Sequence, residues 1–188
     1  MLCDSSGQDV VNSFSLVAYI PDPLRKFLDD LRRELVPGCA PNAHLTILPP
    51  RPLSGTPADA IETIRSRISD FSAFEIETGE VLAFPVSDVV YLSIKKGSQE
   101  LLPMYRSLNV GPLQYREPFP YHPHITLAQG LTREESVELT ALARRRWSEY
   151  TYKRVFPVES LVFVQNTTRN LWVDLAYFQL HPEPSIRR

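Results

Sequence analysis

Apolar and polar residues follow two recurring patterns along this chain, and together the patterns predict a mixed α+β fold. Clusters of β-branched and aromatic residues indicate strands, whereas apolar residues three and four positions apart indicate helices. The predicted strands are residues 13–20, 42–48, 74–78, 81–84, 89–94, 121–128, 151–157, 160–165 and 171–180. The predicted helices are residues 24–35, 57–69, 99–108 and 132–147, the last opening with a Thr-x-x-Glu capping box.

The order of these elements occurs twice. A strand, a helix, a short strand containing His-x-Thr, another helix and further strands start at residue 13 and again at residue 89. The two His-x-Thr segments are 80 positions apart, which favours an internal duplication into two facing lobes; two units are too few for a solenoid. We therefore expect a single bilobal domain over residues 13–180, with loose tails at residues 1–12 and 181–188.

Two predicted strands carry the same chemistry-bearing pattern, a histidine followed two positions later by a threonine. In residues 42–48 and 121–128, the positions between and after these two residues are apolar. Alternate side chains of a strand share one face. Each histidine is therefore expected to project together with its threonine, while the apolar neighbours are buried. The four motif residues are His44, Thr46, His124 and Thr126.

These residue types suit acid–base chemistry at a phosphate. Two imidazoles, which titrate near neutral pH, can act as opposed general base and general acid. Two hydroxyls beside them can donate hydrogen bonds to the non-bridging phosphate oxygens. In-line displacement at phosphorus needs an attacking side and a leaving side, and the paired motifs supply both without a metal or another cofactor.

The paired motifs His44-Leu45-Thr46 and His124-Ile125-Thr126 resemble those of the 2H phosphoesterase superfamily, and within it the 2′-5′ RNA ligase-like branch. The resemblance covers residues 13–180. It implies two pseudo-two-fold-related lobes, each an antiparallel sheet with outer helices, and a cleft between them. It also implies metal-independent action on 2′,3′-cyclic phosphates or 2′-5′ linkages of RNA or nucleotides, with the two histidines as catalytic residues and the two threonines binding the phosphate.

Residues near the motifs offer possible further substrate contacts. Members of the RNA ligase-like branch commonly have an arginine three positions after the second threonine, where this chain has Gln129; Pro49 holds the matching place after the first motif. Arg51, Lys95 and Lys96 could supply positive charge instead. Tyr91, Phe119 and Tyr121 could stack on a base.

His122 lies two positions before His124 and is expected on the same face, as a neighbour of the site. One alternative is a metal site made by these two histidines and His44, although no carboxylate falls among them. Another alternative is a module that binds a nucleotide or an RNA end without turnover, which the missing arginine favours.

Composition narrows the function classes and partners. Lys and Arg number 20 against 22 Asp and Glu, a net charge of −2, which argues against a general nucleic-acid coat and leaves room for a local basic cleft. The two nearest glycines are 14 positions apart, too far for a nucleotide-binding glycine loop or a nucleophile elbow.

The expected partner is a nucleotide or RNA with a cyclic phosphate or a 2′-5′ linkage. No apolar run reaches 18 residues and the first residues lack the pattern of a secretory signal. We therefore expect a cytoplasmic monomer with no cofactor, no membrane contact and no obligate protein partner.

Overall fold

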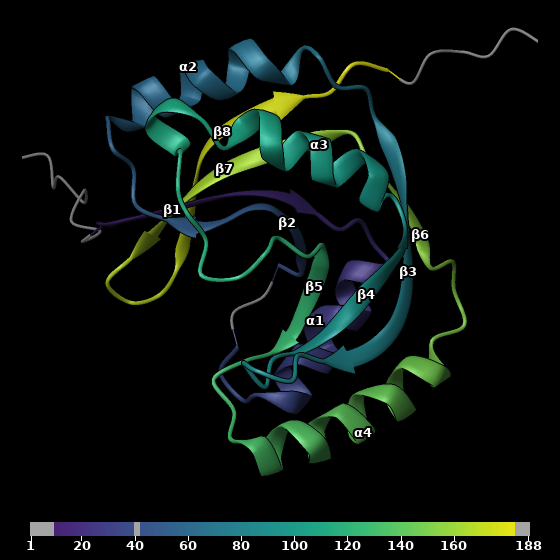
Figure 1. Ribbon diagram of the computed structural model, residues 1–188. Coiled ribbons are helices and arrows are strands. Elements are labelled where there is room, and N and C mark those ends of the chain that lie inside the picture. The colour runs from purple at the N-terminus through teal and green to yellow at the C-terminus, as the bar shows by residue number, and fades with distance from the viewer. Residues whose placement is uncertain (1–9, 40–41, 183–188) are drawn as a thin grey trace, which may run out of the picture.

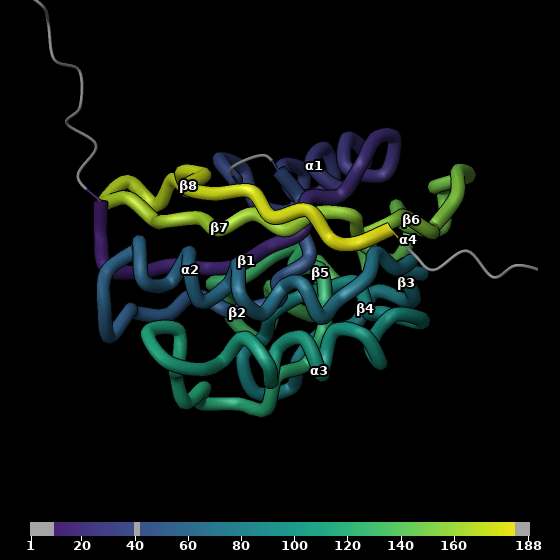
Figure 2. The backbone as a smooth tube through the Cα atoms, turned by 90° about the horizontal axis from the view of Figure 1, so that it is seen from above, coloured from purple at the N-terminus to yellow at the C-terminus, as the bar shows by residue number. Residues whose placement is uncertain are grey.

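A computed structural model describes residues 10–39 and 42–182, which form two four-stranded antiparallel sheets (Figure 1). The first sheet has the order β2 (His44–Arg51), β1 (Val10–Tyr19), β7 (Ser160–Thr167), β8 (Trp172–Gln179). The second has the order β5 (His124–Ala128), β4 (Val90–Lys96), β3 (Phe74–Ala83), β6 (Val155–Val158). In Figure 2 strands β8, β7 and β1 run side by side across the view. The expected α+β class with antiparallel lobes is confirmed.

Four helices and one short 3-10 turn cover these sheets: α1 (Leu24–Leu35), α2 (Pro57–Ile68), α3 (Ser98–Leu108), η1 (Gly111–Leu113) and α4 (Arg133–Glu149). Helices α1 and α4 pack against the second sheet, and α2 and α3 against the first. Helix α4 begins with the predicted capping box, in which Thr132 and Glu135 each accept a backbone N–H from the other residue. Each lobe is therefore a sheet with outer helices.

The two lobes are not the two consecutive halves of the sequence. Strand β3, which follows the first motif along the chain, pairs with β4 in the second sheet, whereas β7 pairs with β1 in the first. Helix α1 likewise contacts β5 and α4. The two sheet orders correspond strand by strand, as a pseudo-two-fold relation requires. The repeats have thus exchanged elements, and each lobe depends on both.

Several boundaries differ from the prediction for local reasons. Strand β1 starts at Val10, inside the expected tail, because it pairs with Thr167 of β7. Residues 1–9 and 183–188 lie outside the described residues. His181, also placed in a tail, is exposed but bridges Ser72 through its backbone. Strand β6 starts at Val155 rather than residue 151, and β8 covers residues 172–179.

Two predicted strand ends are wrong because a bulge carries the strand further. Strand β2 continues through Pro49 and Pro50 to Arg51; it is an edge strand, where proline is tolerated, and its register with β1 shifts there. Strand β3 is continuous across Gly79, where two strands were expected, with a register shift in its pairing to β4. A Cβ at Gly79 would lie 2.5 Å from Oγ of Ser93, so a larger residue there would displace the hydroxyl that accepts the backbone N–H of Glu80.

One large apolar core joins both sheets and all four helices. It contains the apolar residues of both motifs, which are fully or almost fully buried: Leu45, Ile47, Ile125 and Leu127. The motif histidines and threonines are half-buried on the opposite faces of their strands. The predicted phase of both motif strands is confirmed. Within the described part of the chain, no helix is long and apolar enough to cross a membrane.

Candidate active site

The two motif histidines occupy equivalent places. His44 is the first residue of β2 and His124 the first of β5. Both strands form the edge of their sheet, and they contact each other near the middle of the molecule (Figure 1). The contact of these two edges brings both motifs to one region, with Thr46 and Thr126 on the same strand faces as their histidines.

Each imidazole is held in the same way by the backbone. Nδ1–H of His44 donates to the carbonyl of Asn42 at 2.8 Å, and Nδ1–H of His124 donates to the carbonyl of His122 at 2.7 Å. A carbonyl can only accept, so the proton lies on Nδ1 when the ring is neutral. Asn42 adopts φ = 74°, a left-handed conformation that asparagine tolerates. In both rings Nε2 is left to exchange a proton with a substrate.

Burial lowers the pKa of both histidines below the ordinary value. For His44 the other contributions are the nearby charges of Arg32 and His124, which lower the pKa, and the Asn42 hydrogen bond and Asp29, which raise it. For His124 burial lowers the pKa most, the His122 hydrogen bond opposes it, and the charge of His122 lowers it further. Both rings are therefore biased towards the neutral form, and His124 lies close enough for its charge to lower the pKa of His44.

Helix α1 supplies a charged pair behind His44. The Asp29 carboxylate accepts the backbone N–H of Ala43 at 2.7 Å, which fixes the residue just before the histidine. Nη1 of Arg32 lies 3.8 Å from the same carboxylate, too far for a hydrogen bond. Within residues 10–39 and 42–182, the buried Nε and Nη1 of Arg32 have no hydrogen-bond partner. This pair was not predicted from the sequence; its signal there is the i, i+3 spacing of opposite charges beside an apolar helix stripe.

Aromatic rings surround His124. Phe84 and Tyr91 stack with centroids 4.0 Å apart, and the His124 ring meets them edge-on at 5.1 and 5.4 Å. Tyr91, expected as a possible substrate contact, is only 6% exposed and lies beneath the histidine. Its burial raises the pKa of its phenol. The position of Tyr91 favours orientation of the imidazole over stacking on a base. Phe84 was not anticipated.

A different set of side chains adjoins His44. Tyr19 is its cross-strand partner on β1, and the Tyr19 hydroxyl donates to Asp174 at 2.5 Å. Tyr177 donates to the other oxygen of the same carboxylate. Burial and this hydrogen bond raise the pKa of Tyr19. These residues were not predicted from the sequence, because β1 and β8 are more than 150 positions apart along the chain.

Tyr121 and His122, the candidate substrate contacts just before β5, have different surroundings in the structure. The Tyr121 hydroxyl donates to the backbone carbonyl of Thr46 at 2.8 Å, which ties the segment before β5 to β2. Burial raises the pKa of Tyr121. His122 is exposed, with its ring 6.5 Å from that of His124. Tyr121 and His122 thus adjoin the site, the first through a bond within the protein.

Arg51 does not point its charge to the site; the expectation that it contacts substrate is corrected. The side chain is buried and pairs with Glu117 at 2.5 Å. Its other nitrogens donate to the carbonyls of Pro49 and Leu113 and to the side chain of Asn109. Every nitrogen of the guanidinium is engaged within the protein, so Arg51 is a structural residue.

The three-histidine alternative finds no support in the geometry. Among the residues that the structure describes, no three His, Cys, Asp or Glu side chains are grouped as a metal ion would need. Gln129, at the family's usual arginine position, is exposed just after β5.

The comparisons with known proteins agree with this geometry. A family model described as the 2′-5′ RNA ligase superfamily matches residues 20–170. A Staphylococcus epidermidis protein named "Putative phosphoesterase" is 28% identical over 132 residues, covering 69% of this chain and 68% of that one.

Solved structures share the fold. E. coli LigT complexed with 3′-AMP has a TM-score of 0.64 at 16% identity, covering 90% of this chain and 98% of its own. The Thermus thermophilus protein TT0787 has a TM-score of 0.59 at 16% identity, covering 91% and 99%. With the family model spanning both motifs, this chain belongs to the 2′-5′ RNA ligase superfamily of 2H phosphoesterases.

Proposed function

We propose that this protein is a phosphoesterase that acts on 2′,3′-cyclic phosphates or 2′-5′ linkages of RNA or nucleotides. The observation that carries the proposal is the matched pair of imidazoles at the start of β2 and β5. Each ring donates its Nδ1–H to a carbonyl two residues earlier, so that both have Nε2 available for proton transfer.

The proposed reaction uses both histidines at one phosphorus. With a cyclic phosphate, one neutral imidazole takes a proton from water as the oxygen attacks phosphorus. The other, protonated, imidazole gives its proton to the ribose oxygen that leaves from the opposite side. The hydroxyls of Thr46 and Thr126 hold the non-bridging oxygens, where charge develops in the transition state. The reaction consumes one water and needs no metal or nucleotide cofactor.

Relatives support a nucleotide as the partner. Crystal structures of E. coli LigT are complexed with 3′-AMP, NADP+ and ATP. We propose that this chain also binds nucleotides. Because Gln129 stands where the family usually has an arginine, another group must help to bind the phosphate. A monomeric state and a cytoplasmic location stay predictions from the sequence.

The test is turnover of the four nucleoside 2′,3′-cyclic phosphates by the purified protein, with separation of the 2′- and 3′-phosphate products. His44→Ala and His124→Ala are each expected to lower turnover at least about 100-fold, since each removes one proton-transfer group. The double variant should lose far less than the product of the two, because the pair acts as a unit. His181→Ala is the matched control, since this exposed histidine lies outside the site.

Three results would contradict the proposal. Full activity in His44→Ala would end the two-histidine mechanism. Activity that disappears with a chelator and returns with zinc would replace it by a metal-dependent one. Nucleotide binding without turnover in the wild-type protein would leave the non-catalytic binding module as the function.

A further inference from the structure

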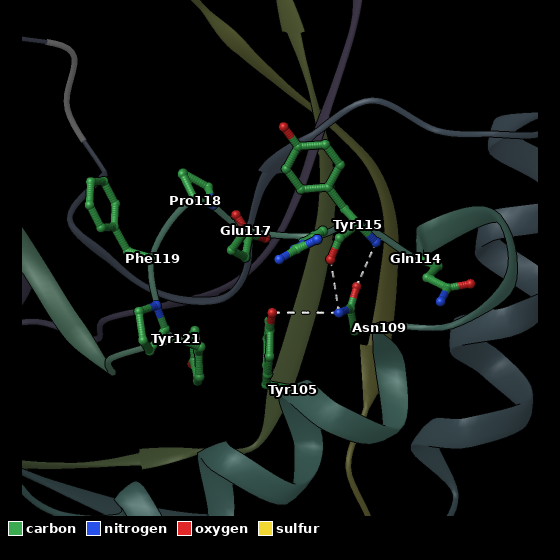
Figure 3. A pocket seen from close by; sticks show the side chains of 10 residues that line it. Tyr105, Asn109, Gln114, Tyr115, Glu117, Pro118, Phe119 and Tyr121 are labelled. Carbon is green, nitrogen blue, oxygen red and sulfur yellow. Dashed lines mark hydrogen bonds between the residues drawn. The ribbon is translucent and has the colours of Figure 1, made fainter.

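A pocket of about 540 Å³ lies beside the two motifs, in the segment that leads from α3 to β5 (Figure 3). This volume falls within the roughly 300–1,000 Å³ of ordinary small-molecule sites. The pocket does not include either motif histidine. Tyr121, which forms one wall, donates its hydroxyl to the carbonyl of Thr46. The pocket therefore shares a wall with the proposed phosphate site.

Four of the ten residues that line the pocket are aromatic. Tyr105 and Tyr121 stack with centroids 4.3 Å apart and planes within 7° of each other. Phe119 and Tyr115 stand at other sides of the opening (Figure 3). Phe119 is 56% exposed, although water solvates an aromatic face poorly. Flat rings of this kind bind planar ligands, and nucleobases stack on them without regard to sequence.

The one charge in the pocket lining that no ion pair within the described residues compensates is positive. Glu117 is paired with the buried Arg51, so its charge is compensated. Arg116 also lines the pocket, and no residue in the described part of the chain forms an ion pair or hydrogen bond with its side chain. Aromatic faces beside an unpaired arginine are the usual combination for single-stranded nucleic acid, in which rings stack on bases and cations meet phosphates.

The pocket is built before any ligand arrives. Oδ1 of Asn109 accepts the backbone N–H of Tyr115 at 2.9 Å, and Nδ2 of Asn109 donates to the carbonyl of Tyr115 at 3.1 Å. Arg51 donates to the side chain of Asn109 and to the carbonyl of Leu113. Because these bonds fix residues 109–115, this part of the pocket would lose little conformational freedom on binding a ligand.

We propose that this pocket binds a second nucleotide of a single-stranded RNA, the one next to the nucleotide whose phosphate lies between the two histidines. The inference rests on the proposed function and narrows its substrate class from free nucleotides to oligonucleotides. The neighbouring base stacks on the exposed ring of Phe119, beside Tyr115, and Arg116 meets a backbone phosphate.

The experiment compares kcat/KM for adenosine 2′,3′-cyclic phosphate with that for a tetranucleotide ending in the same cyclic phosphate. The wild-type protein should favour the tetranucleotide. Phe119→Ala should lower the ratio of the two values by about 5- to 150-fold, the range for loss of one base–aromatic stack. Tyr152→Ala removes a similarly exposed aromatic ring outside the pocket and should keep the wild-type ratio.

A binding measurement separates this inference from the proposed function. A 5′-fluorescein tetranucleotide ending in a 3′-phosphate is titrated with each protein and followed by anisotropy. Phe119→Ala should weaken binding, and Arg116→Gln should reduce the dependence of log Kd on log salt concentration by about one. If the wild-type protein turns over neither substrate, the proposed function is refuted. The anisotropy titration would still test whether the pocket binds the oligonucleotide. An unchanged ratio, or unchanged binding in Phe119→Ala, would overturn the pocket assignment.

Discussion

Replacing Arg51 by methionine removes a charge from the interior while keeping much of the side-chain volume. The Arg51 side chain is 1% exposed and that of its partner Glu117 is 11% exposed. Without the guanidinium, the half-buried Glu117 carboxylate, which also lines the pocket, is left unpaired, and the carbonyls of Pro49 and Leu113 lose a donor. Breaking a fully buried ion pair costs about 3–5 kcal/mol of unfolding free energy, and because water reaches Glu117 the loss here should be about 3 kcal/mol or less.

The cost should depend on pH and on the partner. Burial already raises the pKa of Glu117, and the charge of Arg51 opposes that rise. In Arg51→Met the folded-state pKa lies higher still, so the folded protein binds the proton more tightly than the unfolded chain, and the deficit shrinks as pH falls towards the unfolded value of about 4.3. Adding Glu117→Gln removes the unpaired charge and should recover part of the stability at neutral pH.

The assay is urea unfolding of the wild type, both single variants and the double variant, fitted with a common slope. Arg65→Met is the control, because the Arg65–Glu62 pair is largely exposed and should contribute less than about 1 kcal/mol. A loss below about 1 kcal/mol in Arg51→Met would refute the buried-pair argument. The argument would also be refuted if Arg51→Met lost phosphoesterase turnover with unchanged stability, because a residue that contacts substrate would behave in this way.

Two further predictions concern the site. Arg32→Gln should raise the pKa of His44, because the positive charge of Arg32 lowers it, and Asp29→Asn should lower that pKa, because the carboxylate raises it; profiles of kcat/KM against pH should therefore move up in pH for the first variant and down for the second. Thr46→Ala and Thr126→Ala should each raise the activation free energy by at most about 4 kcal/mol, with recovery in the Thr→Ser variants, because each removes one donor to the phosphate and leaves proton transfer in place. Single-turnover rates measure this, and a larger loss in either Thr→Ala variant would contradict the assigned role.

The motif strands were predictable because the information is local. A period of two decides which side chains share a face, so His44 and His124 could be placed opposite their buried neighbours from spacing alone. The capping box at Thr132 is equally local, since its two hydrogen bonds span three residues. These features need no knowledge of which strands pair.

The sheet partners could not be predicted in the same way. Exchange of β3 and β7 between the sheets depends on long-range pairing, and neither strand carries a pattern that names its partner. The burial of Arg51 has the same origin: its four partners include residues 58 to 66 positions away. An arginine directly after a Pro-Pro pair has the pattern of a surface loop until the fold places Glu117 beside it.

The same limit applies to the difference between the two histidines. The motifs are matched in sequence and in backbone hydrogen bonds, yet their surroundings are not. His44 lies near the charges of Asp29 and Arg32 from α1, whereas His124 is packed by aromatic rings and lies near the charge of His122. The two motifs are therefore equivalent in their backbone hydrogen bonds, but the charges around their histidines differ. Two imidazoles with unlike surroundings need not exchange the roles of acid and base, and variants of α1 act on one of them alone. Whichever limb of the pH profile moves in Arg32→Gln and moves oppositely in Asp29→Asn is the limb to which His44 contributes most.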